Sequence, residues 1–117
     1  MFDEWASIEW AHEEGLKFKL SEELRYRPKA GGLYVVPQGF PTDLASIPVL
    51  LWFFLPPFGN YLSAAVLHDW FCKQEWISRL DGDKLFLEAM LASNVKLWKA
   101  YVMYYGVRAY AVMGRVK

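Results

Sequence analysis

The spacing of apolar side chains changes once along this chain, near residue 40. Before that point apolar and charged residues alternate, as in the stretch LKFKL at residues 16–20. Such alternation sends successive side chains to opposite faces of a strand. Turn-forming residues separate the alternating runs at residues 12–15 and 29–32. Residues 1–40 are therefore predicted to form an antiparallel β-meander with one solvent-exposed face.

Beyond a connector rich in proline, glycine and aromatic residues, at 41–61, the apolar spacing becomes helical. Three helices are predicted, at residues 62–76, 79–92 and 95–113. Ser78-Arg79-Leu80-Asp81 has the form of a capping box, with Asp in place of the usual Glu, at the start of the second helix. Asn94 is expected to cap the third. Strands first and helices after is the α+β pattern, with the helices packed on the dry face of the sheet.

A chain of 117 residues has room for a single domain, made here of the meander, the connector and a helical part over residues 62–113. Its content of 55% hydrophobic and 22% charged residues excludes a disordered protein. The most apolar stretch, residues 47–58, contains three prolines and is shorter than the roughly 20 residues of a membrane-spanning helix. The acidic N-terminus lacks the basic and apolar segments of a signal peptide, so secretion by that route is not expected.

Thirteen basic and thirteen acidic side chains cancel, which argues against a nucleic-acid partner. The charges are unevenly placed, because residues 1–15 carry only acids and no acid follows Glu88. The two ends are either solvated or form a docking patch for another protein. The high aromatic content leaves rings available for such a contact. The single cysteine, Cys72, excludes an intramolecular disulfide and fits a reducing compartment. The oligomeric state is left open.

One group of polar residues falls where the helical pattern should be apolar. The neighbours of His68 three and four residues away are Ala64, Ala65, Phe71 and Cys72, which places the imidazole on an apolar face. A carboxylate at position 83 lies on the apolar stripe of the next helix and needs a partner there. The connecting turn is short, so the helices should pack antiparallel with His68 and Asp83 level. An imidazole held by a buried carboxylate is an oriented general base.

Structural explanations compete with this chemistry. A His68–Asp83 hydrogen bond can fix the register of two helices without any catalytic role. Asp69 and Lys73 have the spacing of a surface ion pair, and Asp43 can cap a turn. Alternatively, Asp69 and Asp43 bind a divalent cation beside His68. Such an oxygen-rich site would suit calcium, magnesium or manganese better than zinc.

Three motifs extend across most of the chain. They are VPQGFPTDLASIP at residues 36–48, AAVLHD at 64–69, and DKLFLEA at 83–89 with Arg79 before it. They resemble a small family of phage and prophage proteins known as domain of unknown function 1353. The resemblance implies a phage or prophage origin, and therefore a place in the host cytoplasm or in the virion. It implies no particular activity.

The helix pair is also similar to that of phospholipase A2 enzymes. That likeness implies that His68 is the base that activates water, Asp69 a calcium ligand and Asp83 the carboxylate that orients the imidazole. Two functions follow as hypotheses. The first is a hydrolase acting on a lipid, on cell-wall material or on a phosphoester, with peripheral contact to lipid and no membrane span. The second is a non-enzymatic phage accessory or virion-associated protein that docks on another phage or host protein.

Overall fold

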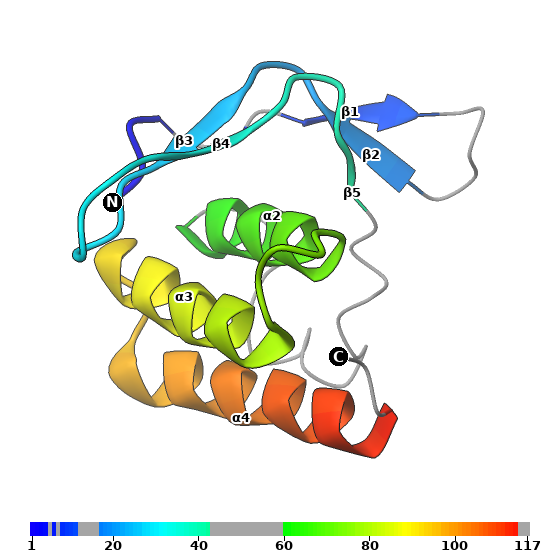
Figure 1. Cartoon of the computed structure of the whole chain (residues 1–117). Coiled ribbons are helices and arrows are strands. Elements are labelled where there is room, and N and C mark those ends of the chain that lie inside the picture. Colours follow the sequence, from blue (N-terminus) through cyan, green and yellow to red (C-terminus); the bar gives the residue numbers. More distant parts are fainter. Residues whose placement is uncertain (5, 7, 12–16, 43–59, 115–117) are drawn as a thin grey trace.

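A computed structural model describes residues 1–4, 6, 8–11, 17–42 and 60–114 of the chain and shows strands layered over helices (Figure 1). The strands are β1 (Ile8–Ala11), β2 (Lys17–Leu20), β3 (Leu24–Tyr26), β4 (Tyr34–Val36) and β5 (Pro41–Thr42). The helices are α2 (Asn60–Cys72), α3 (Arg79–Ala92) and α4 (Leu97–Gly114). The predicted α+β class, with strands before helices, is confirmed. Most of the predicted connector, Asp43 included, lies outside the described residues.

Among the described residues the strands form two antiparallel sheets, one in the order β1-β2-β5 and one of β3 with β4. The expected hairpins β1–β2 and β3–β4 are present. A continuous meander was predicted, but β2 pairs with β5 instead of β3, so the strands divide between two sheets. This pairing arises because the chain returns to β2 after β4. The Gly39 N–H donates to the Leu20 carbonyl at 2.8 Å, and the Leu20 N–H donates to the Phe40 carbonyl at 3.1 Å. Gly39 has a φ of 81°, which glycine adopts without strain.

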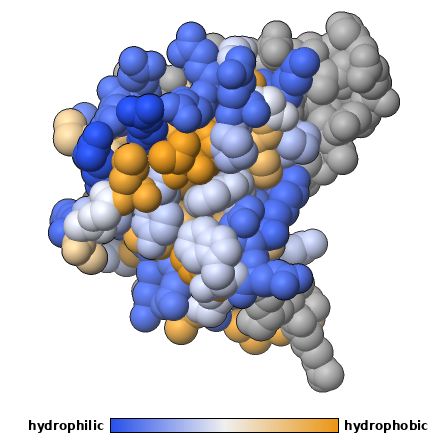
Figure 2. All heavy atoms as spheres, turned by 45° about the horizontal axis from the view of Figure 1, so that its top comes forward, coloured by the Kyte–Doolittle hydropathy of each residue, from blue (hydrophilic) through white to orange (hydrophobic). Residues whose placement is uncertain are grey.

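The strand layer has one solvent-exposed face, as the alternating pattern predicts. In β3, Leu24 and Tyr26 are buried while Arg25 between them is exposed. Figure 2 shows the molecule with the strand layer turned toward the viewer, and this face is largely hydrophilic around a small apolar area.

Helix α2 lies between the strand layer and α3, and α4 packs on the far side of α3 (Figure 1). Ser63, Ala64, Val66 and Leu67 of α2 are fully buried. A helix that is buried on several sides needs apolar residues around most of its circumference, and α2 has them. None of the described helices is both long and apolar enough to span a bilayer.

Helices α2 and α3 approach each other closely at Gly82. A Cβ atom added there would lie 3.2 Å from Cβ of Phe71, closer than side chains normally pack. Glycine at this position therefore lets the two backbones come together. Gly82 immediately precedes Asp83, and Phe71 follows His68 by three residues. The close contact of Gly82 with Phe71 therefore brings the side chains of Asp83 and His68 near each other.

The start of α3 agrees with the predicted cap. Ser78 is extended, and its hydroxyl oxygen accepts the backbone N–H of Asp81 at 3.0 Å. The first helix, in contrast, ends at Cys72 instead of Trp76.

The prediction that Asn94 caps the third helix is wrong, because Asn94 closes α3 instead. It has a φ of 64°, in the left-handed region, and its N–H donates to the Leu91 carbonyl at 3.2 Å. The Val95 N–H donates to the Met90 carbonyl at 3.0 Å. These two bonds form a Schellman motif, in which asparagine is tolerated at the left-handed position. Helix α4 begins only at Leu97.

Replacing Asn94 tests this assignment. Asn94→Ala should lower the free energy of unfolding by about 1 kcal/mol, because a Cβ-bearing residue without asparagine's local hydrogen bonds is strained at positive φ. Asn94→Gly should be neutral or stabilising, because glycine is the preferred residue at this position. Urea denaturation of the two variants measures the difference. Equal stabilities would contradict a Schellman motif at the end of α3.

Candidate functional site

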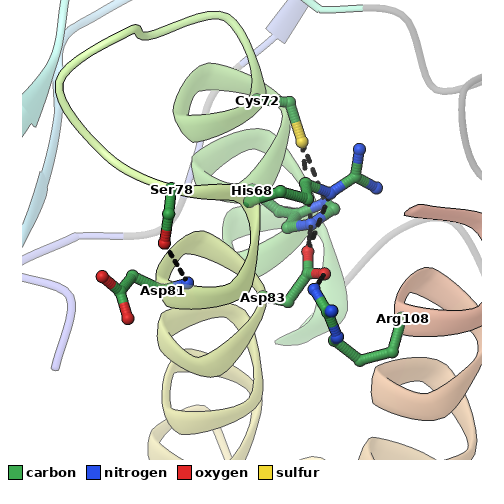
Figure 3. Close-up of polar contacts among 7 residues, drawn as sticks. His68, Cys72, Ser78, Asp81, Asp83 and Arg108 are labelled. Atoms are coloured by element: carbon green, nitrogen blue, oxygen red, sulfur yellow. Dashed lines mark hydrogen bonds and ion pairs between the residues drawn. The ribbon is translucent and has the colours of Figure 1, made fainter. Parts of the chain in front are cut away.

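His68 on α2 and Asp83 on α3 face each other, as the helical spacing predicts (Figure 3). His68 Nε2 and Asp83 Oδ1 are 2.6 Å apart, a short hydrogen bond. Asp83 has no exposed surface, and His68 keeps 7% of its own. The predicted contact is confirmed, while its chemical role stays a prediction.

Two arginines complete the surroundings of Asp83, and neither was predicted from the sequence to lie there. Arg79 Nε donates to Oδ1 at 3.0 Å, and Arg108 Nη1 donates to Oδ2 at 2.9 Å. Arg79 precedes Asp83 by four residues on the same helix, a spacing that could have revealed the pair. Arg108 comes from α4, and nothing in the local pattern links it to Asp83. The carboxylate therefore joins α2, α3 and α4.

The network determines the protonation of Asp83. Burial alone would raise the pKa of this carboxyl, but hydrogen bonds from His68, Arg79 and Arg108 outweigh it and hold the pKa below its ordinary value. An ionised carboxylate can only accept hydrogen bonds. His68 Nε2 must therefore carry the proton of the 2.6 Å bond.

Burial disfavours the charged form of His68 and lowers its pKa, whereas the hydrogen bonds with Asp83 and Cys72 raise it. The balance places the pKa above the ordinary histidine value. When the ring is neutral, the Nε2 proton is committed to Asp83 and Nδ1 carries a lone pair. His68 is thus a stronger base than an ordinary histidine, and its Nδ1 is the nitrogen that can accept a proton.

Cys72 and Phe86 line the imidazole. The Cys72 sulfur lies 3.7 Å from Nε2 and 4.0 Å from Nδ1 of His68. A thiol that gives its proton to Nδ1 should be closer to that nitrogen than to Nε2, so the sulfur is poorly aligned as a nucleophile. The Phe86 ring packs on His68 with the ring centroids 4.5 Å apart. These neighbours keep the surroundings of the base largely apolar.

Asp69 forms an ion pair with Lys73. Its Oδ2 lies 3.8 Å from Lys73 Nζ, and this i, i+4 pair was one of the predicted alternatives. The same Nζ donates to the Pro41 carbonyl at 3.2 Å. Asp69 is largely buried but remains next to the surface, since Lys73 is well exposed.

The described part of the chain contains no group of three or more His, Cys, Asp or Glu residues that could hold a metal ion. Asp83 is already bound by two guanidinium groups, which makes it a poor cation ligand. Asp43, the second predicted ligand, lies outside the described residues. The described residues by themselves therefore do not fit a divalent cation, and the predicted site beside Asp69 depends on Asp43.

Residues 18–107 match the family model described as "Protein of unknown function (DUF1353)". The chain belongs to this family. The family predicted from the sequence motifs is thereby confirmed. The matched span includes His68, Asp69, Arg79 and Asp83 and ends one residue before Arg108.

Two relatives from Sinorhizobium fredii (strain NBRC 101917 / NGR234) are similar to this DUF1353 chain. "Uncharacterized protein y4jT" is 38% identical over 95 residues, which make up 80% of this chain and 28% of the relative. "Uncharacterized protein y4iH" is 39% identical over 71 residues, or 59% of this chain and 30% of the relative. The chain thus spans less than a third of the length of either protein. No solved structure gives a significant match.

Replacing Asp83 should be far more damaging than replacing a nearby exposed acid. Asp83→Asn leaves Arg79 and Arg108 facing a neutral amide, and breaking a buried ion pair in this way typically costs about 3 to 5 kcal/mol. Asp81→Asn, two residues earlier and exposed, removes one negative charge from the first turn of α3 and should cost no more than about 1 kcal/mol. Chemical denaturation at neutral pH measures both. Similar values for the two variants would contradict the role of Asp83 as the link between three helices.

Proposed function

We propose that this DUF1353 protein is a hydrolase in which His68 takes a proton from water and Asp83 holds the imidazole in place. The supporting observation is the 2.6 Å bond between Nε2 and Asp83, which leaves Nδ1 as the proton acceptor. The same division of labour is implied for His68 and Asp83 by the likeness to phospholipase A2. On this basis the favoured substrate is a carboxylic ester of a lipid.

The proposed proton transfers involve the side chains of His68 and Asp83. His68 Nδ1 removes a proton from water as the water oxygen forms a bond to the ester carbonyl carbon. The ionised Asp83 stabilises the imidazolium that results, and Arg79 and Arg108 fix the carboxylate in its orientation. The imidazolium then returns its proton to the alcohol oxygen as the carbon–oxygen bond of the ester breaks. No step is assigned to a metal ion.

The divalent cation remains a separate proposal. Asp69 and Asp43 would supply its oxygen ligands, and Lys73 would have to move away from Asp69 when the cation binds. Phage or prophage origin likewise remains a proposal that rests on the motifs.

The hydrolase hypothesis is tested with vesicles of phosphatidylcholine and phosphatidylglycerol, by measuring released fatty acid with and without calcium, magnesium or manganese. His68→Asn should lower the rate by about 100-fold or more, the range for loss of a general base. Cys72→Ser should keep most of the activity, because the sulfur is not the nucleophile. The wild-type rate should rise with pH as His68 loses its proton, and its midpoint should lie above the ordinary histidine pKa of about 6.5.

Several results would contradict the hypothesis. One is the absence of fatty-acid release under every condition, and another is a wild-type rate in a folded His68→Asn variant. Equal losses in Cys72→Ser and His68→Asn would indicate a thiol nucleophile instead of water. Circular dichroism of each variant separates a chemical defect from a folding defect.

A second candidate function, docking on another protein, is favoured by the outer face of α4. Trp98, Tyr101, Tyr105 and Val112 are exposed and spaced three, four and seven residues apart, which places them on one side of the helix. The buried residues Ala100, Met103, Val107 and Ala111 occupy the opposite side. Helix α4 therefore has one apolar stripe in the core and another facing outward. Exposed apolar surface of this kind marks an interaction site.

The charges near this stripe indicate the kind of partner. Lys96 and Lys99 lie beside it, and no acid follows Glu88 in the sequence. An acidic protein surface with apolar residues at its centre would be complementary.

Crosslinking tests this second function through Lys96 and Lys99. Wild-type protein in a lysate of its host should give lysine-to-carboxylate crosslinks from these residues to an acidic segment of one partner. The double variant Tyr101→Ser, Tyr105→Ser should lose the crosslinks, because it removes the centre of the stripe. A control on the strand side, Leu33→Ser, should keep them, because Leu33 is exposed and lies away from the stripe. Crosslinks that persist in the double variant would contradict docking through α4.

A further inference from the structure

A hollow of about 490 Å³ lies on the other side of α3 from the His68 network. It is lined by Tyr34, Trp76, Ile77, Asp81, Lys84, Leu85 and Glu88. Asp81 points away from the side of α3 that carries Asp83 (Figure 3). The volume falls within the range of roughly 300 to 1,000 Å³ that is typical of small-molecule sites. The hollow is therefore separate from the proposed hydrolase site.

Trp76 is the most unusual residue of the hollow, because it is exposed and yet held firmly. It exposes 58% of its surface. Its ring lies within 10° of parallel to the Tyr34 ring, with centroids 5.9 Å apart. Trp70 and Phe71 contact it edge-on at centroid distances of 5.7 and 6.3 Å. Its Nε1–H donates to Gln74 Oε1 at 3.3 Å. A ring ordered in this way loses little conformational freedom when a ligand stacks on it.

The polar residues of the hollow come from one side of α3. Asp81, Lys84 and Glu88 are spaced three and four residues apart, so they lie along the same face of the helix. Tyr26 donates its hydroxyl proton to Glu88 Oε2, and the Lys29 N–H donates to Oε1 at 3.1 Å. Glu88 is thus fixed in orientation while each oxygen keeps a further lone pair. No ion pair found among the described residues includes Asp81 or Lys84.

The mixture of charges favours a neutral ligand over an ion. Lys84 lies about one helical turn from each acid, so its charge offsets much of the attraction that Asp81 and Glu88 would have for a cation. The two carboxylates in turn repel an anion. What remains is a row of hydrogen-bond acceptors and donors beside an apolar aromatic surface. A ligand that fits has one apolar face and polar groups around its edge.

We propose that this hollow binds a carbohydrate, with a pyranose ring stacked on Trp76 and its hydroxyl groups bound by Asp81, Lys84 and Glu88. A pyranose ring has a face of C–H groups that packs on an indole. Its equatorial hydroxyl groups both donate and accept hydrogen bonds, which the carboxylates and the ammonium group can satisfy. The inference does not depend on the hydrolase hypothesis, since none of these residues contacts His68 or Asp83.

The test uses the tryptophan indole N–H signals of ¹⁵N-labelled protein in NMR titrations with chitotriose, cellotriose and maltotriose. At least one of these sugars should shift the Trp76 signal in a saturable manner. Asp81→Asn, an exposed change that preserves the fold, should weaken binding by about tenfold, which corresponds to about 1.4 kcal/mol. Trp76→Ala should abolish saturable shifts in the backbone signals of Tyr34 and Lys84. Trp98→Ala is the matched control, because Trp98 is similarly exposed, at 54%, but lies on α4. It should bind as the wild type does.

Three outcomes would overturn the proposal. The first is the absence of a saturable Trp76 shift with all three sugars. The second is a loss of affinity in Trp98→Ala equal to that in Trp76→Ala, which would indicate nonspecific stacking. The third is a Trp76 shift with arginine or citrate at least as large as the shift with the sugars, which would identify an ion site. A His68→Asn variant should retain the sugar-induced shift, so a failure here is distinguishable from a failure of the hydrolase hypothesis.

Discussion

The buried carboxylate of Asp83 is the contact on which the helical half of this protein depends. It accepts hydrogen bonds from His68 on α2, Arg79 on α3 and Arg108 on α4, and it has no exposed surface. A charge in this position is stable only while its partners remain. The three helices are therefore held in one relative arrangement. The same arrangement orients the imidazole and turns the aromatic stripe of α4 away from the core.

Sequence periodicity predicted the parts of the fold in which burial follows a repeating pattern. The α+β class, the extent of α3 and the contact between His68 and Asp83 were accessible because a polar residue on an apolar face stands out. The position of Arg108 was not, because its partner lies 25 residues away on another helix. The prediction that Asn94 caps the third helix was wrong because asparagine is favourable both at the start of a helix and at the left-handed position after one. The return of the chain to β2 depends on a backbone hydrogen bond at Gly39. The pattern of hydrophobic residues cannot predict such a bond.

The hollow beside Trp76 also escaped prediction, for a different reason. A tryptophan in a sequence is ordinarily assigned to the core, and only the structure distinguishes an exposed ring from a buried one. Helix α3 separates this hollow from the His68 network, so one face of a single helix offers exposed charged groups of both signs while the other holds a buried ion cluster.

The close packing at Gly82 has a consequence for the imidazole that involves no polar atom. Because a methyl group at this position would press against Phe71, the size of the side chain at residue 82 limits how closely α2 and α3 can pack. A wider residue would lengthen the bond between Nε2 and Oδ1, and the ring would gain freedom to rotate although every donor and acceptor was still present. The orientation of His68 is thus governed by steric size at a neighbouring position as well as by the chemistry of its partners.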